Sequence, residues 1–229
     1  MAVNIVEMID DGVRVKNVLV SVSDKNGLNN FIPELLKIDN GIKLYSTGGT
    51  YQALKDLLGP DLTERNLFQV SAFTGQPEMQ GGLVKPLDFK IYMGLLSATY
   101  NPAHANDLER AKGIFFDMVV GNLYPFVKTV SAGSSPEAAR ANIDIGGPCM
   151  VRAAAKNFLR VASVTDPADY SSILEELRRT KGILSLHARF ELAKKAFTHT
   201  AAYDTAISGY WGKTSFESVQ SCYKISRNQ

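Results

Sequence analysis

The stretch KNVLVSVSDKNGLNNFIPELLKI, residues 16–38, places an apolar strand directly before a helix. Its first part, KNVLVSVS, is short, apolar and β-branched, which is typical of a buried strand. The second part repeats apolar residues at helical spacing, at Leu28, Phe31, Ile32, Leu35 and Leu36. The stretch therefore predicts one strand–helix unit.

The same order returns in the next segment of the chain. IKLYSTGG, residues 42–49, ends a second strand in a glycine pair, and TYQALKDLLG is a helix that we expect to stop at Gly59. Further strands are predicted at LFQV (67–70), KIYMGLL (90–96), FFDMVVGNLY (115–124) and RVASVTD (160–166). Alternating strands and helices favour an α/β fold with a mostly parallel sheet covered on both faces.

The character of the chain changes after Pro136, where helices dominate. We expect them over residues 136–141, 148–157, 169–180 and from about 186 to 210. There is no internal repeat and no low-complexity linker. We therefore expect one domain over residues 1–229, with a core of about 16–212, frayed termini and a helical C-terminal extension on the sheet.

Composition excludes several classes of protein. Lys and Arg number 25 against 23 Asp and Glu, without the basic clusters that follow a phosphate backbone, so nucleic acid is not expected. Cys149 and Cys222 form neither a disulfide framework nor a metal spacing, and three histidines do not suggest zinc. No run is long and apolar enough for a signal peptide or a membrane span. We expect a cytoplasmic protein without metal or cofactor.

Two strand ends carry groups suited to one phosphate. SVSDKNG offers Ser21, Ser23 and Lys25, and STGGT offers Ser46, Gly48, Gly49 and Thr50 at the start of a helix. Hydroxyls, free amides, glycines and one lysine are what a single phosphate needs. The alternative is that Asp24 and Asn26 cap a helix and that residues 47–50 form a tight turn. Neither segment has the spacing of a P-loop or of a dinucleotide fingerprint.

NIDIGGPCMVRAAAKN, residues 142–157, places Asp144 on a loop before a helix that carries Arg152 and Lys156 on one face. These cations could simply face water, but a paired Asp and Lys is also a standard unit for handling protons. GNLYPF adds Asn122 and Tyr124 at the end of a strand, although a tyrosine before proline is more often a packed turn anchor. GQPEMQGGLVKPLDFK, residues 75–90, is a long irregular loop with Lys85 at its centre, either solvated or aimed at a site.

Together these segments resemble the cyclohydrolase domain of the bifunctional family that joins IMP cyclohydrolase to AICAR transformylase. The match runs in order through SVSDKNGL, STGGT, TGQPEM, VVGNLYPFVKTV, NIDIGGPCMVRAAAKN, VTDPADY and KAFTHTAAYD to Tyr210. It implies a fold like methylglyoxal synthase with extra helices, and the dehydrative closure of 5-formamidoimidazole-4-carboxamide ribonucleotide to IMP. It also implies a homodimer. The transformylase domain of the family is absent from this sequence, so a separate formyltransferase is expected.

The resemblance assigns a role to each candidate residue. Lys85 would stabilise the oxyanion that develops on the formyl oxygen, and Asp144 with Lys156 would handle the amide proton. Tyr124 would hydrogen-bond the reacting groups, and Arg152 would support Asp144 or its loop. The phosphate would be held by Ser21, Ser23, Lys25, Ser46, Gly48, Gly49 and Thr50, and the base would be lined by Asn122, Ile145 and Gly146.

The sequence departs from the family around Lys85. The usual order is arginine, valine, lysine, threonine, leucine, histidine, proline, whereas this chain has Leu83, Val84, Lys85, Pro86, Leu87, Asp88 and Phe89, and a later histidine is Tyr92. Pro86 removes a hydroxyl and a backbone N–H, and Asp88 could pair with Lys85. The alternative function is therefore a catalytically weak module that binds a purine nucleotide. Methylglyoxal synthase itself is disfavoured, because the chain is long and IDIGG has no role there.

Overall fold

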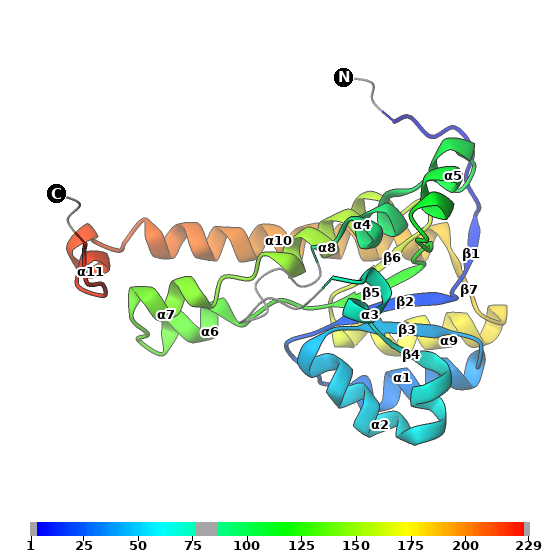
Figure 1. The fold of residues 1–229 in the computed structure, drawn as a ribbon, viewed down its shortest axis with the longest axis horizontal. Helices are drawn as coiled ribbons and strands as arrows, with labels where there is room; N and C mark the ends of the chain where they lie inside the picture. Colours follow the sequence, from blue (N-terminus) through cyan, green and yellow to red (C-terminus); the bar gives the residue numbers. More distant parts are fainter. Residues whose placement is uncertain (1–3, 77–86, 227–229) are drawn as a thin grey trace.

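A central sheet of five parallel strands organises the molecule (Figure 1). The computed structural model describes residues 4–76 and 87–226. The strand order is β4-β3-β2-β5-β6, with β2 (Asn17–Ser21) in the centre. The others are β3 (Lys43–Ser46), β4 (Leu67–Gln69), β5 (Met118–Gly121) and β6 (Ala162–Val164). The predicted mostly parallel sheet is confirmed.

Helices cover both faces of this sheet, as the apolar strands require. Along β2 the side chains alternate, so that Val18 and Val20 lie in one buried cluster and Leu19 lies in another. The first cluster packs against α1 (Leu28–Ile38), α2 (Gly48–Asn66) and α9 (Tyr170–Thr180). The second packs against α4 (Phe89–Leu96) and α8 (Gly146–Lys156). Both faces of the sheet are therefore excluded from water.

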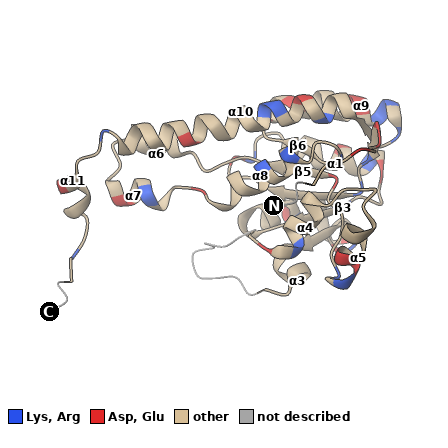
Figure 2. Cartoon of the chain, turned by 90° about the horizontal axis from the view of Figure 1, so that it is seen from above, with Lys and Arg blue, Asp and Glu red and all other residues tan. Residues whose placement is uncertain are grey.

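A long helix, α10 (Leu186–Trp211), leaves the body of the molecule and forms an arm (Figures 1 and 2). Its first half packs on α8 and β6. Its second half packs with α6 (Phe126–Ser131), α7 (Pro136–Ala141) lies against α6, and α11 (Phe216–Gln220) closes the end of the arm. Phe126 and Tyr203 belong to the small apolar cluster inside this arm. The predicted helical extension is confirmed, but only its first half lies over the sheet.

The remaining elements are short. β1 (Gly12–Arg14) pairs antiparallel with β7 (Ile183–Ser185) beside the main sheet. The short helices are α3 (Val70–Thr74), α5 (Pro102–Arg110) and the 3₁₀ turn η2 (Pro167–Asp169). The elements not predicted from the sequence are β1, β7 and the short helices α3, α5, α6 and α11, whose periodicity extends over few residues.

Three expected elements differ from the structure. The run of residues 90–96 is the helix α4 and not a strand: the Asp88 side chain accepts a hydrogen bond from the Lys90 amide and caps it. Gly59 does not end its helix but kinks α2 with a φ of 72° before the chain continues to Asn66. Helix α8 begins at Gly146, two residues before Pro148.

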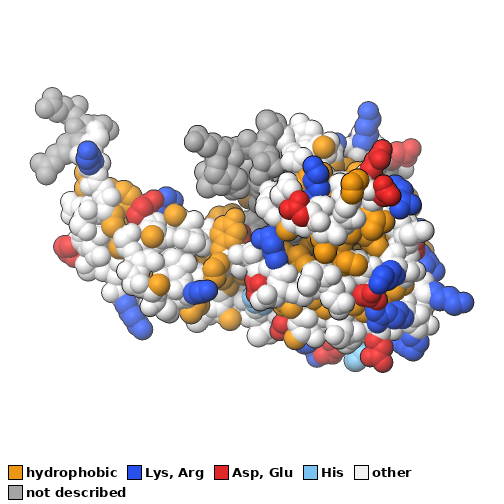
Figure 3. Space-filling model, turned by 90° about the horizontal axis from the view of Figure 1, so that it is seen from below, with side chains coloured by type: hydrophobic (Ala, Val, Ile, Leu, Met, Phe, Trp, Pro, Cys, Tyr) orange, Lys and Arg blue, Asp and Glu red, His pale blue; other side chains and the backbone are white. Residues whose placement is uncertain are grey.

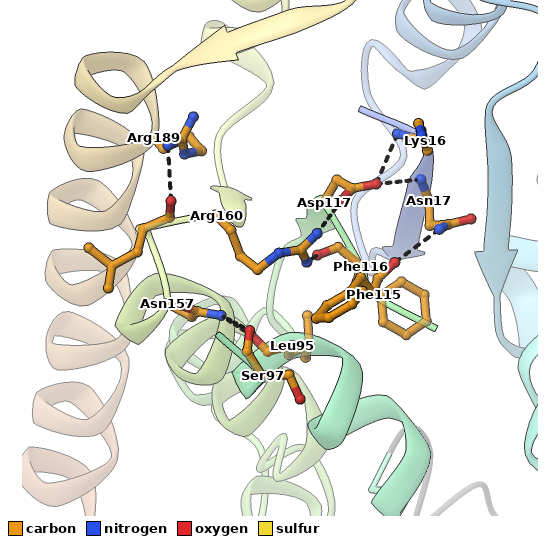
Figure 4. A network of polar contacts seen from close by, with 11 residues as sticks. Lys16, Asn17, Leu95, Ser97, Phe115, Phe116, Asp117, Asn157, Arg160 and Arg189 are labelled. Atoms are coloured by element: carbon orange, nitrogen blue, oxygen red, sulfur yellow. Dashed lines mark hydrogen bonds and ion pairs between the residues drawn. The ribbon is translucent and has the colours of Figure 1, made fainter. Parts of the chain in front are cut away.

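A buried ion pair ties the N-terminal ends of three strands together (Figure 4). Asp117 accepts hydrogen bonds from the amides of Lys16 and Asn17 at 2.9 Å and pairs with Arg160 at 2.7 Å. Arg160 also donates to the Phe116 carbonyl at 2.6 Å. Because each of these groups bonds within the fold, we assign the network to structure and look for the functional site at the opposite edge of the sheet.

Candidate functional site

The strand order places a crevice between β2 and β5 at the C-terminal edge of the sheet. From β2 the chain moves outward to β3 and β4, and then returns to the other side of β2 at β5. Such a reversal leaves a crevice where ligands of parallel α/β sheets usually bind. Ser21 is in register with Gly121 at this point, so the loops that follow both strands meet there.

Asn122 joins the two sides of this crevice. Its side-chain oxygen accepts hydrogen bonds from the amides of Ser23 at 2.7 Å and Asp24 at 2.9 Å. Its side-chain nitrogen donates to the Asp24 carbonyl at 2.7 Å. The side-chain amide of Asn122 thus fixes the loop that carries Ser23 and Lys25.

Two of the candidate phosphate hydroxyls are buried within the fold. Ser46 is fully buried, and its Oγ donates to the Val20 carbonyl at 2.7 Å. Thr50 Oγ1 accepts from the Val22 amide at 3.1 Å and donates to the Val22 carbonyl at 3.0 Å. These hydroxyls hold the start of α2 against the end of β2, and their burial leaves other groups to meet a ligand.

The groups that remain accessible at the start of α2 are backbone amides. Gly48 and Gly49 open the helix and are exposed, and no side chain caps it. The first amides of a helix have no partner within the helix and attract anions. Lys25 is exposed on the neighbouring loop, with its Nζ 3.4 Å from the Ser23 carbonyl oxygen. The structure therefore brings Ser21, Ser23, Lys25, Gly48 and Gly49 to one edge of the sheet.

Asp144 lies across the crevice, at the start of α8. Its carboxylate accepts a hydrogen bond from the Gly147 amide at 2.8 Å and a longer one from the Tyr124 amide at 3.4 Å. A Cβ on Gly147 would lie 2.5 Å from the Asp144 carboxylate, so only glycine allows this approach. Burial raises the pKa of Asp144 above its ordinary value, against the opposing effect of these two amides. The carboxyl is thus held in place and kept more basic than an exposed aspartate.

Side chains around Asp144 leave an apolar and aromatic rim. Tyr124 is 49% exposed and Ile145 is 57% exposed, while Gly146 is buried beneath them. Tyr203 from α10 accepts a hydrogen bond from the Asp144 amide at 2.8 Å. The KAFTHTAAYD segment holds Tyr203, but the contact of this tyrosine with Asp144 could not be predicted, because the two residues are far apart in the chain. Tyr203 and Gly147 are the positioning residues that it missed.

The structure does not bring Lys156 to Asp144. Lys156 is the last residue of α8, whereas Asp144 precedes its first turn. At 1.5 Å per residue, an 11-residue helix separates them by roughly 16 Å. The expected pairing overlooked this length, because residues twelve apart sit at opposite ends of the helix.

Arg152 also differs from its expected role. Its guanidinium lies 5.7 Å from the centre of the Phe197 ring on α10, so it braces the two helices and not the Asp144 loop. Lys85, with Leu83, Val84 and Pro86, lies outside the described residues. Within residues 4–76 and 87–226, no group of three or more His, Cys, Asp or Glu is arranged to hold a metal ion. Among the helices of the same ranges, none has the length and apolar character to cross a membrane.

Comparison with known proteins gives two adjoining matches along the chain. Residues 27–149 match the family model described as the MGS-like domain, and residues 154–229 match the one described as the AICARFT/IMPCHase bienzyme. A solved structure described as the crystal structure of ForH superposes with a TM-score of 0.69 at 29% identity, covering 85% of this chain and 97% of that chain. These matches confirm the fold class that the sequence predicted.

Curated relatives are proteins named "Bifunctional purine biosynthesis protein PurH". The one from Leptospira biflexa is 44% identical over 202 residues, which is 88% of this chain and 38% of that protein. The one from Persephonella marina is 47% identical over 193 residues, which is 84% of this chain and 36% of that protein. The chain therefore spans less than two fifths of the length of these relatives, and the region it matches is the cyclohydrolase part.

Proposed function

Since the chain belongs to the family of MGS-like domains, and its relatives are named purine biosynthesis proteins, we propose that it is an IMP cyclohydrolase. The reaction would be the dehydrative ring closure of 5-formamidoimidazole-4-carboxamide ribonucleotide to IMP. The observation that carries this proposal is the Asp144 carboxyl, half-buried beside Tyr124 at the point where the strand order reverses. We also propose that residues 1–229 act as one domain.

The proposed ring closure requires a group that accepts and returns protons, and it uses no cofactor. The carboxamide nitrogen of the substrate attacks the formyl carbon, a C–N bond forms, and the formyl oxygen finally leaves as water. Asp144 would take one proton from the attacking nitrogen and pass it to the departing oxygen, and the formamide N–H would supply the second proton of the water as the C=N bond forms and the C–O bond breaks. A raised pKa suits this exchange, because a carboxyl that is too acidic neither accepts nor returns protons well near neutral pH.

Holding the substrate in a fixed orientation would supply the rest of the rate enhancement. Ring closure between neighbouring groups is accelerated mainly by holding them in an attack geometry. The amides of Gly48 and Gly49, with Lys25, would hold the phosphate, and the rim formed by Tyr124 and Ile145 would hold the base. We propose that Lys85 stabilises the developing oxyanion. Lys156 is not part of this machinery, because it lies at the far end of α8.

A second function, binding a purine nucleotide without turnover, is favoured by one observation. The Asp144–Lys156 pair that the family resemblance implies does not form, so Asp144 has no cationic partner on α8. A binding module would still hold the phosphate and base with the same groups. The two functions differ only in turnover.

One assay distinguishes them. The purified protein is incubated with the formylated ribonucleotide and IMP is followed by absorbance, while IMP binding is measured by calorimetry. We expect turnover in the wild type and at least about a tenfold decrease for Lys85→Ala, with no change for Lys55→Ala, an exposed lysine on α2. Tight IMP binding without turnover would overturn the enzyme proposal and support the binding module.

We further propose that a formyltransferase supplies the substrate, since the curated relatives are named bifunctional. A homodimer is the proposed oligomeric state, since the projecting arm exposes large apolar side chains such as Val127 and Phe216. These proposals concern partners and leave the chemistry at Asp144 unchanged.

A further inference from the structure

A cavity of about 490 Å³ lies at the opposite end of α8 from the proposed substrate site. It is bounded by the last turn of α8, the end of α4 and helix α5, with Asn4 and Val6 of the N-terminal segment along one side. Lys156 and His104 both line it, and no Asp or Glu is among the described residues of its lining. It thus brings together one ammonium group and one imidazole, without a carboxylate in the described lining.

Two polar side chains of this cavity, His104 and Asn157, are held by hydrogen bonds within the fold. The Ala98 amide donates to His104 Nδ1 at 3.0 Å. Because Nδ1 accepts, the neutral ring carries its proton on Nε2, which leaves an N–H donor free. Asn157 donates to the carbonyls of Leu95 at 2.7 Å and Ser97 at 3.1 Å, and so locks the end of α8 to the end of α4. The His104 donor therefore needs little rearrangement to meet a ligand, whereas Lys156 is an exposed side chain that would close on it.

The rest of the lining is mostly apolar. Leu96 and Leu159 contribute aliphatic surface, and Val6 adds to it from the N-terminal segment. This segment is anchored further along, where Arg189 donates to the Asp10 carbonyl at 2.8 Å and Tyr100 donates to the Asp10 carboxylate at 2.6 Å. The cavity combines apolar surface with two side chains that can donate hydrogen bonds, Lys156 and His104, which is the composition of a small-molecule site.

The ordinary explanation covers only part of this arrangement. A lysine in the last turn of a helix interacts favourably with the helix dipole whether or not a ligand is present. That explanation accounts for Lys156 alone, and it leaves the oriented His104 donor and the absence of acidic residues in the described lining unexplained. One ammonium group and one N–H donor in the same cavity favour an anion.

We propose that this cavity binds a small organic anion. Its carboxylate or phosphate group would lie against Lys156 and the Nε2–H of His104, and its apolar part would lie against Leu96 and Leu159. The site is separate from the proposed catalytic edge, because the length of α8 lies between them.

The three histidines of the chain make a direct test possible. The Cε1–H signals of His104, His187 and His199 are followed by NMR in the full-length protein during titration with benzoate, phenyl phosphate or inorganic phosphate. We expect a saturable shift of the His104 signal and none of the signal of His187, which is exposed on α10. Tighter binding of phenyl phosphate identifies a phosphate site, and tighter binding of benzoate identifies a carboxylate site.

Variants connect the binding to the cavity. Lys156→Ala should weaken the binding at least fivefold, Lys156→Arg should retain most of it, and the matched control Lys55→Ala should leave it unchanged. Circular dichroism checks that each variant is folded. Asp144→Asn should bind like the wild type, since it alters only the other end of α8. A His104 signal that does not move with any probe, or equal affinity in Lys156→Ala and the wild type, would overturn the proposal.

Discussion

At the residue scale, the chemistry depends on whether Asp144 is a proton acceptor or only a helix cap. Its carboxylate accepts the Gly147 amide at 2.8 Å, as a capping residue does. Burial nevertheless raises its pKa, whereas a pure cap would gain from a low one. Asparagine separates the two roles, because it can cap a helix but cannot accept a proton from the substrate.

We predict that Asp144→Asn lowers kcat/KM at least about a hundredfold, in line with the contribution of a general base. Its free energy of unfolding at neutral pH should change by less than about 1 kcal/mol, because the amide oxygen still accepts from Gly147. Steady-state kinetics and urea unfolding measure the two effects. Unchanged kinetics in this variant would show that Asp144 is a cap and nothing more.

The raised pKa of Asp144 also predicts the direction in which the stability of the protein changes with pH. Since the folded state raises the pKa of Asp144 above 3.8, the folded protein binds its proton more tightly than the unfolded chain. Stability from this group is therefore present at low pH and decreases as the pH rises from 3.8 through the raised pKa. Over that window Asp144→Asn should gain stability relative to the wild type. The activity of the wild type should rise over the same window, as the base ionises.

At the element scale, the pattern of apolar residues predicted the strands of the sheet. It predicted the wrong element where a helix cap or a close contact determines the structure. The strands around Val18, Leu44 and Val119 are buried on both faces, and their continuous apolar runs predicted them as strands. Residues 90–96 have an equally apolar run, but Asp88 caps them as a helix. A Cβ on Gly94 would lie 2.2 Å from the Ile114 carbonyl oxygen, so this glycine lets α4 approach the chain before β5. That contact is invisible in the sequence.

The candidate site was predictable for the same reason that the sheet was. Residues at the ends of parallel strands meet at one edge, which is how Ser23 and Asn122 were placed together, whereas Asp144 was placed by its loop before α8 and by the family resemblance. The predicted pairing of Lys156 with Asp144 was wrong because residues 142–157 were treated as one group. The two residues are separated by the length of α8. The structural roles of Ser46 and Thr50 could not be predicted, since a sequence does not show whether a hydroxyl is buried or exposed.

Thr50 provides a prediction for the joint between β2 and α2. Thr50→Val keeps the shape of the side chain but removes the partner of both the amide and the carbonyl of Val22. We expect it to lower the free energy of unfolding by about 2–3 kcal/mol, the cost of leaving buried backbone groups unpaired. The matched control on the same helix is Thr63→Val, whose hydroxyl makes one long bond of 3.4 Å at an exposed position. Urea unfolding should show less than about 0.5 kcal/mol for the control, and equal losses would mean that the Thr50 bonds do not hold the joint.

At the scale of the whole molecule, the arm is the feature that needs a partner. In the space-filling view it projects beside the body as a narrower extension (Figure 3). The half of α10 beyond Lys195 carries Asp204 as its only charged residue. Val127 on α6 is 57% exposed and Phe216 on α11 is 71% exposed. A projecting surface with exposed large apolar side chains and a weakly charged helix segment is typical of an interface between protein chains.

We therefore predict that the protein is a homodimer joined through the arm, with a solution mass of twice the 25.0 kDa of one chain. Sedimentation equilibrium should show this mass for the wild type and for Phe190→Glu, a control that places the same charge on the body half of α10. Val127→Glu and Phe216→Glu together should shift the protein toward the monomer, because each would bury an unpaired charge in the interface. A wild-type monomer at micromolar concentration would contradict the prediction. A dimer that resists both substitutions would instead place the interface on the body. The exposed apolar side chains of the arm would then have no part in dimer formation.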